Sequence, residues 1–330
     1  MSRILNLDDW LRARLCGEPF AVAPASEDAS FRRYFRVTTA AGTRIVMDAP
    51  PEHEDCRPFV KVARLFRQAG VNVPEVIAAD TDNGYLLLSD LGSTVYLEVL
   101  NELTAGDLYE AAISALVRIQ LASRPDVLPS YSRDLLLREL RLFPDWYVAK
   151  HLGASLSGAQ SDVLGSVFEL ILANNLAQPC VYVHRDYHSR NLMVTDPNPG
   201  IIDFQDAVYG PVTYDLVSLF KDAYIRWDEE RVIDWAVRYW ERAKAAGLPV
   251  DADFGAFYRN FEWMGVQRHI KVLGIFARLF HRDGKDGYLQ DMPLVMAYLR
   301  QACQRYSALA PLLRLLDDLA EQQPAVGYTL

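Results

Sequence analysis

The feature that most limits the possible folds of this chain is a short β-rich island inside a long, otherwise helical stretch. The apolar run 181–183 leads into the polar run 184–191, and the apolar run 200–202 leads into Asp203. Apolar runs with polar residues at their ends are typical of two strands joined by a loop. The pattern therefore predicts a strand–loop–strand hairpin that presents polar side chains at the strand ends.

The polar residues of this island match the needs of phosphoryl transfer. His184-Arg185-Asp186 with Asn191 satisfies H-R-D-x-x-x-x-N, and an Asp-Phe pair begins twelve residues later at Asp203. In phosphoryl transfer a carboxylate orients the attacking hydroxyl, and oxygen ligands hold magnesium on the phosphates. We predict that Asp186 orients the acceptor hydroxyl and that Asn191 and Asp203 bind Mg²⁺. H-x-D alone is a frequent chance match, but the Asp-Phe pair at the correct distance argues against chance.

The first ninety residues predict a small, mostly antiparallel sheet with one helix. Short extended runs are expected at 20–23, 34–38, 43–47, 76–79 and 85–88, and Gly42 fits a hairpin turn. The helix follows Asp55, and its apolar residues recur at i, i+3, i+4 and i+7 from Phe59 to Phe66.

The rest of the chain predicts helices at 97–122, 135–152 and 160–175, and over almost everything from residue 215 onward. A small sheet beside a helical bulk is an α+β, bilobal design. We place the joint at Ser89–Ser93, so that residues 1–91 form an N-lobe and residues 92–330 a C-lobe.

Charge and cysteine usage exclude several classes of function. The chain has 34 basic and 43 acidic side chains, a net charge of −9, which argues against binding to nucleic acid or anionic membranes. No apolar stretch approaches the roughly 20 residues that span a bilayer, and Asp8 and Asp9 do not fit an export leader. The four cysteines are scattered, as expected of reduced thiols. We predict a soluble, cytoplasmic protein without an obligate protein partner, and its oligomeric state stays open.

These motifs resemble the aminoglycoside phosphotransferase and choline kinase-like family, which has a protein-kinase-like fold, over nearly the whole chain. The resemblance implies a kinase of a small molecule that uses ATP and Mg²⁺. The run 87–91 resembles the family's interlobe hinge, which implies adenine contacts from the Ser89 carbonyl and the Leu91 amide. It also implies that Asp215 braces the catalytic loop and that His184 has a structural role.

The chain departs from the general kinase pattern where the phosphates bind. It has no G-x-G-x-x-G loop, Met47 stands where a strand lysine is usual, and the following helix has no mid-helix Glu. The polar run 26–30 is a candidate phosphate-covering turn in which Ser30 contacts phosphate. Arg32 and Arg33 are the candidate replacement cations, and a catalytically silent nucleotide-binding scaffold is the alternative.

Two further runs, 46–51 and 263–276, resemble one subgroup of this family, the anomeric N-acetylmuramate and N-acetylglucosamine kinases of cell-wall recycling. This resemblance implies that a small amino sugar is phosphorylated at C1 during peptidoglycan recycling. Kinases of another small alcohol, such as an aminoglycoside, choline or homoserine, remain as alternatives.

A helix over residues 260–280 provides the candidate sugar contacts. At about 100° per residue, Arg268 falls on an apolar face, and Glu262 and His269 fall close together. A charge on an apolar face is either paired or lines a cavity, so Arg268 is either a structural brace or a fork that grips the carboxylate of N-acetylmuramate. Candidate substrate-binding residues are His188, Glu262, Arg268 and His269. A solvated face is expected at Asn260, Gln267, Lys271 and Arg278.

Overall fold

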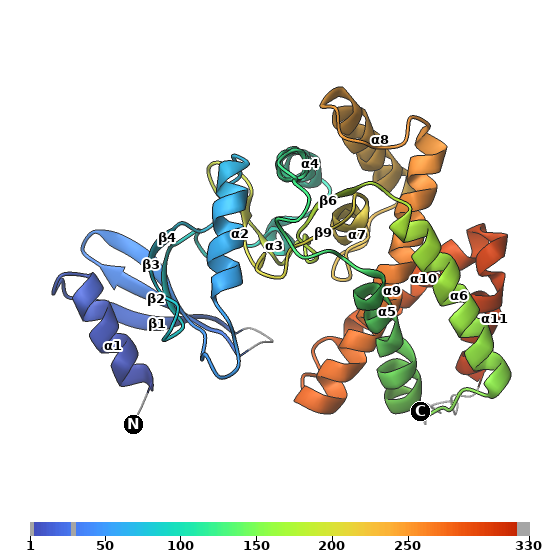
Figure 1. Ribbon diagram of the computed structural model, residues 1–330, viewed down its shortest axis with the longest axis horizontal. Helices are drawn as coiled ribbons and strands as arrows, with labels where there is room; N and C mark the ends of the chain where they lie inside the picture. Colours follow the sequence, from blue (N-terminus) through green and yellow to red (C-terminus); the bar gives the residue numbers. More distant parts are fainter. Residues whose placement is uncertain (1–2, 28–30, 322–330) are drawn as a thin grey trace. The chain divides into compact units, whose positions relative to one another are not determined.

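The computed structural model describes residues 3–27 and 31–321 and divides into two compact units (Figure 1). The first unit comprises Met1–Ala122 and Ser189–Ala207, and the second comprises Ser123–His188 and Val208–Leu330. The chain therefore passes from one unit to the other three times. The N-lobe/C-lobe boundary expected after Leu91 marks a hinge and not a division into compact units, and it stays a prediction.

The first unit contains the predicted antiparallel sheet. Its strands, in the spatial order β1-β2-β3-β5-β4, are β1 (Ala21–Glu27), β2 (Arg33–Thr39), β3 (Gly42–Asp48), β5 (Tyr85–Ser89) and β4 (Val76–Asp80). Gly42 has φ +124° in the turn between β2 and β3, as the predicted hairpin requires. Strand β1 continues through Ser26 and Glu27, so the expected turn at 26–30 is wrong for these two residues. Ser30 lies outside the described residues.

Two helices accompany this sheet, although the sequence predicted one. Helix α2 (Arg57–Gln68) buries the predicted stripe of Phe59, Val62, Ala63 and Phe66. Helix α1 (Arg3–Arg14) was not expected. It packs Leu7, Trp10 and Leu11 into a cluster of apolar side chains from the sheet and its flanks, which includes Val37, Val46, Tyr85 and Leu87. Burying apolar side chains in this way stabilises the unit by roughly 1.5–3 kcal/mol for each large residue.

The rest of the first unit consists of two helices and the hairpin that positions two of the candidate site residues. The helix predicted at 97–122 is interrupted between α3 (Tyr96–Val99) and α4 (Ala105–Leu121), because Asn101 Oδ1 accepts hydrogen bonds from the amides of Leu103 and Thr104. A hairpin of β7 (Leu192–Met193) and β8 (Gly200–Ile201) belongs to the same unit.

The second unit is mainly helical. Strands β6 (Cys180–Val183) and β9 (Val208–Pro211) form an antiparallel pair. The helices are α5 (Arg133–Leu142), the π-helix η1 (Phe143–His151), α6 (Gly158–Leu176), α7 (Tyr214–Phe220), α8 (Glu229–Ala245), α9 (Phe254–Asp283), α10 (Met292–Arg305) and α11 (Ala310–Glu321), with short 3₁₀ turns at η2 (Leu289–Asp291) and η3 (Ser307–Leu309). The single helix predicted at 135–152 changes to π geometry just before Pro144, which has no N–H to donate.

Helix α9 is the centre of this unit, because α5, α6, α7, α10 and η1 all pack against it (Figure 1). Its approach to the end of α5 is very close. A Cβ atom on Gly274 would lie 2.4 Å from the carbonyl carbon of Leu142, so a glycine is required there. None of the helices in the described ranges is both long and apolar enough to cross a membrane.

Candidate active site

The loop after β6 is held by the start of α7. The Asp215 carboxylate accepts hydrogen bonds from the amides of His184, at 2.7 Å, and Arg185, at 3.0 Å. Arg185 has φ +79°, in the left-handed region that non-glycine residues rarely adopt. Burial raises the pKa of Asp215 to about 7. This geometry matches the brace that the resemblance implied for Asp215, and the buried His184 packs edge-on against Tyr187.

Arg185 is also fixed through its carbonyl and its side chain. The carbonyl accepts a hydrogen bond from Arg268 Nη1 at 3.0 Å, and Arg185 Nη2 donates to Glu139 Oε1 at 2.5 Å. Glu139 is buried and also accepts from the Tyr131 hydroxyl, and it lies 3.3 Å from Lys271 Nζ. The backbone just before Asp186 is therefore held by α5, α7 and α9 together.

The Asp186 side chain is 41% exposed and is surrounded by positively charged side chains. Its Oδ1 lies 3.5 Å from Arg268 Nη1. Burial alone raises the pKa of Asp186, but the charges of Lys271, Arg268, His188 and Arg185 outweigh it and hold the pKa well below its usual range. Asp186 is therefore ionised at neutral pH and accepts hydrogen bonds, as a residue that orients a hydroxyl must.

The second pair of candidate residues is positioned by the β7–β8 hairpin. The hairpin predicted between the runs 181–183 and 200–202 is wrong, because Cys180–Val183 pairs with β9 and Gly200–Ile201 pairs with β7. Leu192 pairs with Ile201, and the Ile202 amide donates to the Asn191 carbonyl at 3.1 Å. Asn191 precedes β7 and Asp203 follows β8, so the hairpin brings them together. Asn191 Nδ2 lies 3.3 Å from Asp203 Oδ2.

Asp203 is fixed by its neighbours in sequence. Its φ is +64°, and its Oδ1 accepts a hydrogen bond from Gln205 Nε2 at 2.8 Å. The next residue, Phe204, is fully buried, with ring centroids 4.8 Å from Phe59 and 5.8 Å from Phe66. The apolar stripe of α2 thus anchors Phe204 and sets the position of the adjacent carboxylate.

The chemistry of this pair fits magnesium. Mg²⁺ prefers oxygen ligands and is usually held by one or two carboxylates together with the phosphate oxygens of a nucleotide. Asp203 supplies a carboxylate and Asn191 an amide oxygen, which is the donor set that such a site needs.

Of the two predicted phosphate-binding cations, only Arg32 is brought to Asp203. Arg32 Nη2 lies 3.5 Å from Asp203 Oδ1, and its Nη1 lies 3.9 Å from Glu54 Oε2. Arg33 instead forms an ion pair with Asp48, which is buried and also accepts from Arg3 Nε at 2.7 Å. The two neighbouring arginines therefore have different surroundings.

The predicted hinge residues end the sheet of the first unit. Ser89 is the last residue of β5, and both its amide and its hydroxyl are hydrogen-bonded to the backbone of Glu75. Asp90 accepts two hydrogen bonds from Arg36. A Cβ on Gly200 of the hairpin would lie 3.1 Å from Leu91 Cδ1, so Leu91 packs directly on the hairpin that positions Asn191 and Asp203.

The candidate sugar contacts on α9 are buried in packing. Glu262 is fully buried, 3.4 Å from Lys221 Nζ, 2.5 Å from Arg305 Nη1 and 2.6 Å from the Tyr306 hydroxyl. Arg268 is 4% exposed and bonded to the Asp186 loop, the geometry of the brace alternative.

The other two candidates also lie against protein. His269 is buried, and its ring stacks on Tyr298 with centroids 5.2 Å apart. His188 is 9% exposed and lies edge-on to Tyr224. The expected solvated face of α9 is wrong for Gln267 and Lys271, which are both buried.

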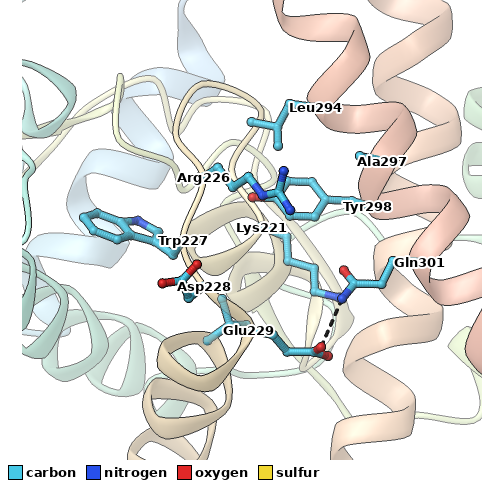
Figure 2. Close-up of a pocket in the computed structure, with 10 residues that line it drawn as sticks. Lys221, Arg226, Trp227, Asp228, Glu229, Leu294, Ala297, Tyr298 and Gln301 are labelled. Carbon is cyan, nitrogen blue, oxygen red and sulfur yellow. Dashed lines mark hydrogen bonds between the residues drawn. The ribbon is translucent and has the colours of Figure 1, made fainter.

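Two features of the second unit had no clear signal in the sequence. The first is the group of contacts around Glu139, which joins α5, α9 and the Asp186 loop, whose residues are far apart in the chain. The one sign of these contacts in the sequence was a lysine, Lys271, on a helix rich in apolar residues. A cavity of about 310 Å³ lies between the end of α7, the start of α8 and α10 (Figure 2). Glu262 and His269 lie behind its wall, where they contact the lining residues Lys221 and Tyr298.

The buried imidazole of His269 predicts a pH-dependent stability. Burial, followed by the charge of Lys221, lowers the pKa of His269 to about 3. The unfolded chain binds a proton at this histidine below about pH 6.5, whereas the folded protein does not. Stability should therefore fall as the pH is lowered from about 7 to about 4.

A His269→Gln variant checks this prediction, because glutamine does not titrate. The free energy of unfolding, measured in urea at pH 7.5 and pH 5, should fall less in the variant than in the wild type. Asp215 acts in the opposite direction over the same range, but it is present in both proteins and cancels in the comparison. An equal fall in both proteins would contradict the prediction.

Comparison with known proteins agrees with these geometries. Residues 21–253 match the model of the phosphotransferase enzyme family. The chain is 49% identical to an N-acetylmuramate/N-acetylglucosamine kinase of Neisseria meningitidis serogroup B, over 100% of both chains. It is 52% identical to a protein of the same name from Pseudomonas aeruginosa, over 97% of this chain and 98% of the relative.

Solved structures show the same fold at low sequence identity. A choline/ethanolamine kinase family protein from Mesorhizobium loti has a TM-score of 0.65 and 16% identity, over 95% of this chain and 100% of that one. The ADP-bound aminoglycoside phosphotransferase APH(2'')-Ib has a TM-score of 0.59 and 12% identity, over 89% and 96%. The predicted α+β, protein-kinase-like fold is thus confirmed. The chain belongs to the phosphotransferase enzyme family and is a kinase with an alcohol group as acceptor.

Proposed function

We propose that the protein is a cytoplasmic, ATP- and Mg²⁺-dependent kinase that phosphorylates the C1 hydroxyl of N-acetylmuramate and N-acetylglucosamine in peptidoglycan recycling. The observation that carries this proposal is the full-length likeness, at 49% and 52% identity, to kinases named for these two sugars. The Asn191–Asp203 pair and the ionised Asp186 support it, because they supply the groups that phosphoryl transfer needs.

In this mechanism Asp186 accepts a hydrogen bond from the acceptor hydroxyl and aims its oxygen at the γ-phosphorus. An anomeric hydroxyl is more acidic than an ordinary alcohol, because the ring oxygen withdraws electron density. A carboxylate of low pKa is a weak base, so it suits an acceptor that loses its proton easily. Asn191 and Asp203 would hold magnesium, which would supply positive charge to counter the negative charge that develops on the phosphates.

Arg32 replaces the missing strand lysine in this proposal. Arg32 lies 3.5 Å from Asp203 and is 11% exposed, so its guanidinium is held beside the carboxylate where the phosphates would bind. The ion pair with Glu54 gives it a second anchor from the segment before α2, in place of the absent helix glutamate.

We predict that Arg32→Ala weakens ATP binding by several-fold to about a hundredfold, the loss expected for charge-assisted hydrogen bonds. Isothermal titration of Mg-ATP into the wild type and the variant measures the change. Arg64→Ala is the matched control, because Arg64 is exposed on α2. Unchanged affinity in Arg32→Ala would remove Arg32 from the nucleotide site.

The proposed function is tested by the chemistry of the product. Incubation with ATP, Mg²⁺ and either sugar should give a sugar phosphate that mild acid hydrolyses, because a glycosyl phosphate is acid-labile. Phosphorus NMR should show coupling to the anomeric proton. A phosphate on the C6 hydroxyl would overturn the C1 assignment and leave the kinase standing.

A panel of other acceptors separates the alternatives. Choline, homoserine and an aminoglycoside should give no turnover under conditions in which both sugars react. Turnover of one of these alcohols in place of the sugars would assign a different acceptor. Nucleotide binding without turnover of any acceptor would indicate a catalytically silent scaffold. This is the alternative suggested by Met47, which stands where a lysine is usual.

A further inference from the structure

The cavity of the second unit has the size and lining of a small-molecule site. Its volume of about 310 Å³ falls in the range of pockets that bind small ligands. Lys221, Arg226 and Gln301 present hydrogen-bond donors to it, and Asp228 and Glu229 present acceptors (Figure 2). A ligand rich in hydroxyl groups needs donors and acceptors together, so the lining suits a monosaccharide.

Most of this lining is fixed by contacts behind the wall. Lys221 is 5% exposed and pairs with the buried Glu262. Gln301 Nε2 donates to Glu229 Oε2 at 3.1 Å (Figure 2). Arg305 pairs with the same carboxylate. These groups already have partners of opposite charge or polarity. They therefore shape the cavity without a net charge that a ligand would have to neutralise.

Arg226 and Asp228 are the exposed charged residues of the lining, and Arg226 is the cation of the two. Among residues 3–27 and 31–321 no carboxylate lies within ion-pair distance of the Arg226 guanidinium. Figure 2 shows Arg226 and Tyr298 among the residues that line the cavity. Arg226 is thus a cation at a polar cavity that still has its charge available for an anionic ligand group.

The wall of the cavity is connected to the loop that contains Asp186. Lys221, Arg226, Trp227 and Asp228 line one side of the cavity. Tyr224, which lies between Lys221 and Arg226 in the chain, is edge-on to His188, with ring centroids 5.4 Å apart. His188 follows Asp186 by two residues, and its amide donates to the Asp186 carbonyl at 3.0 Å. A sugar held in this cavity would therefore lie in the same part of the unit as the carboxylate that orients its hydroxyl.

We propose that this cavity binds the sugar and that Arg226 binds the carboxylate that N-acetylmuramate has and N-acetylglucosamine lacks. This inference rests on the proposed function, whose two sugars differ in this group. Arg268, for which the sequence left open both this role and that of a structural brace, is 4% exposed and donates to the Arg185 carbonyl beside Asp186. Arg226 therefore determines the preference between the two acceptors, and Arg268 braces the loop.

The test is the ratio of kcat/KM for the two sugars, measured in the wild type and in Arg226→Gln. We expect kcat/KM for N-acetylmuramate to fall about tenfold or more, mainly through KM, as for the loss of one charge-assisted pair. For N-acetylglucosamine it should change less than about twofold by the same reasoning. Arg226→Lys keeps the charge and should retain part of the preference. Arg238→Gln removes an exposed arginine of α8 whose partner is Asp234 on the same helix, and it should leave the ratio unchanged.

Calorimetric titration of each sugar into the same proteins gives a second readout that does not depend on turnover. Binding of N-acetylmuramate should weaken in Arg226→Gln, and binding of N-acetylglucosamine should not. Equal losses for the two sugars, or no loss for either, would overturn the role of Arg226 while the proposed function stands. If the wild type phosphorylates neither sugar, the proposed function itself fails, whatever the titrations show.

Discussion

Replacing Asp186 by Ala or Asn should lower kcat by about 10²–10⁴, the usual contribution of a positioned acid–base group. The protein should still fold and bind Mg-ATP, because the side chain is 41% exposed and adds little to packing. Steady-state kinetics with either sugar measures the loss, and nucleotide titration shows that the donor site persists. Asp145→Asn, an exposed carboxylate of the same unit, is the matched control.

The surroundings of Asp186 sharpen this expectation. Its carboxylate balances Arg268, Lys271 and Arg185, so its removal leaves three positive charges without that partner. The Asn variant keeps the shape of the side chain and loses only the charge. If Asn and Ala variants both retain most of the activity, Asp186 is not the residue that orients the acceptor.

Replacing Asp203 by Ala should also abolish turnover, by a different route. The carboxylate is the only charged ligand that the Asn191–Asp203 pair offers to magnesium, so the variant should lose the Mg²⁺-dependent part of nucleotide affinity. Titration of ATP with and without Mg²⁺ separates the two cases, since Asp186→Ala should keep this dependence. Raising the Mg²⁺ concentration should restore some activity to Asn191→Ala and little to Asp203→Ala.

Asp196 supplies the control for this experiment, as Asp196→Asn removes an exposed carboxylate from the turn of the β7–β8 hairpin. A variant Asp203→Ala whose nucleotide affinity still rises with Mg²⁺ would show that the metal is held elsewhere.

Sequence spacing predicted the parts of the site whose determinants are local. The stripe on α2 follows from the periodicity of residues close in the chain. Asp203 was correctly placed at the end of a short strand, although the sequence paired that strand with the run 181–183 and not with β7. The strands of the sheet were predicted for the same reason, to within a few residues at their ends.

Features that depend on distant partners could not be predicted in this way. Gln267 and Lys271 have the polarity of a solvated face, but both are buried, and Lys271 is held there by Glu139 of α5. Glu262 and His269 were correctly placed near one another on α9, yet their partners Lys221, Arg305 and Tyr298 come from other helices. Which of these groups line a cavity and which stand behind it is decided by packing between helices.

The three passages of the chain between the two units limit how this enzyme can be divided or recombined. Residues 1–122 form most of the first unit, but the ring that covers the stripe of α2 belongs to Phe204, which returns from a segment almost seventy residues further along. A fragment that stops at Ala122 would leave Phe59 and Phe66 without this cover and would lack both candidate metal ligands. Exchange of the first unit between related kinases therefore has to transfer residues 189–207 as well, so that gene fusions with a single junction would not give a folded hybrid.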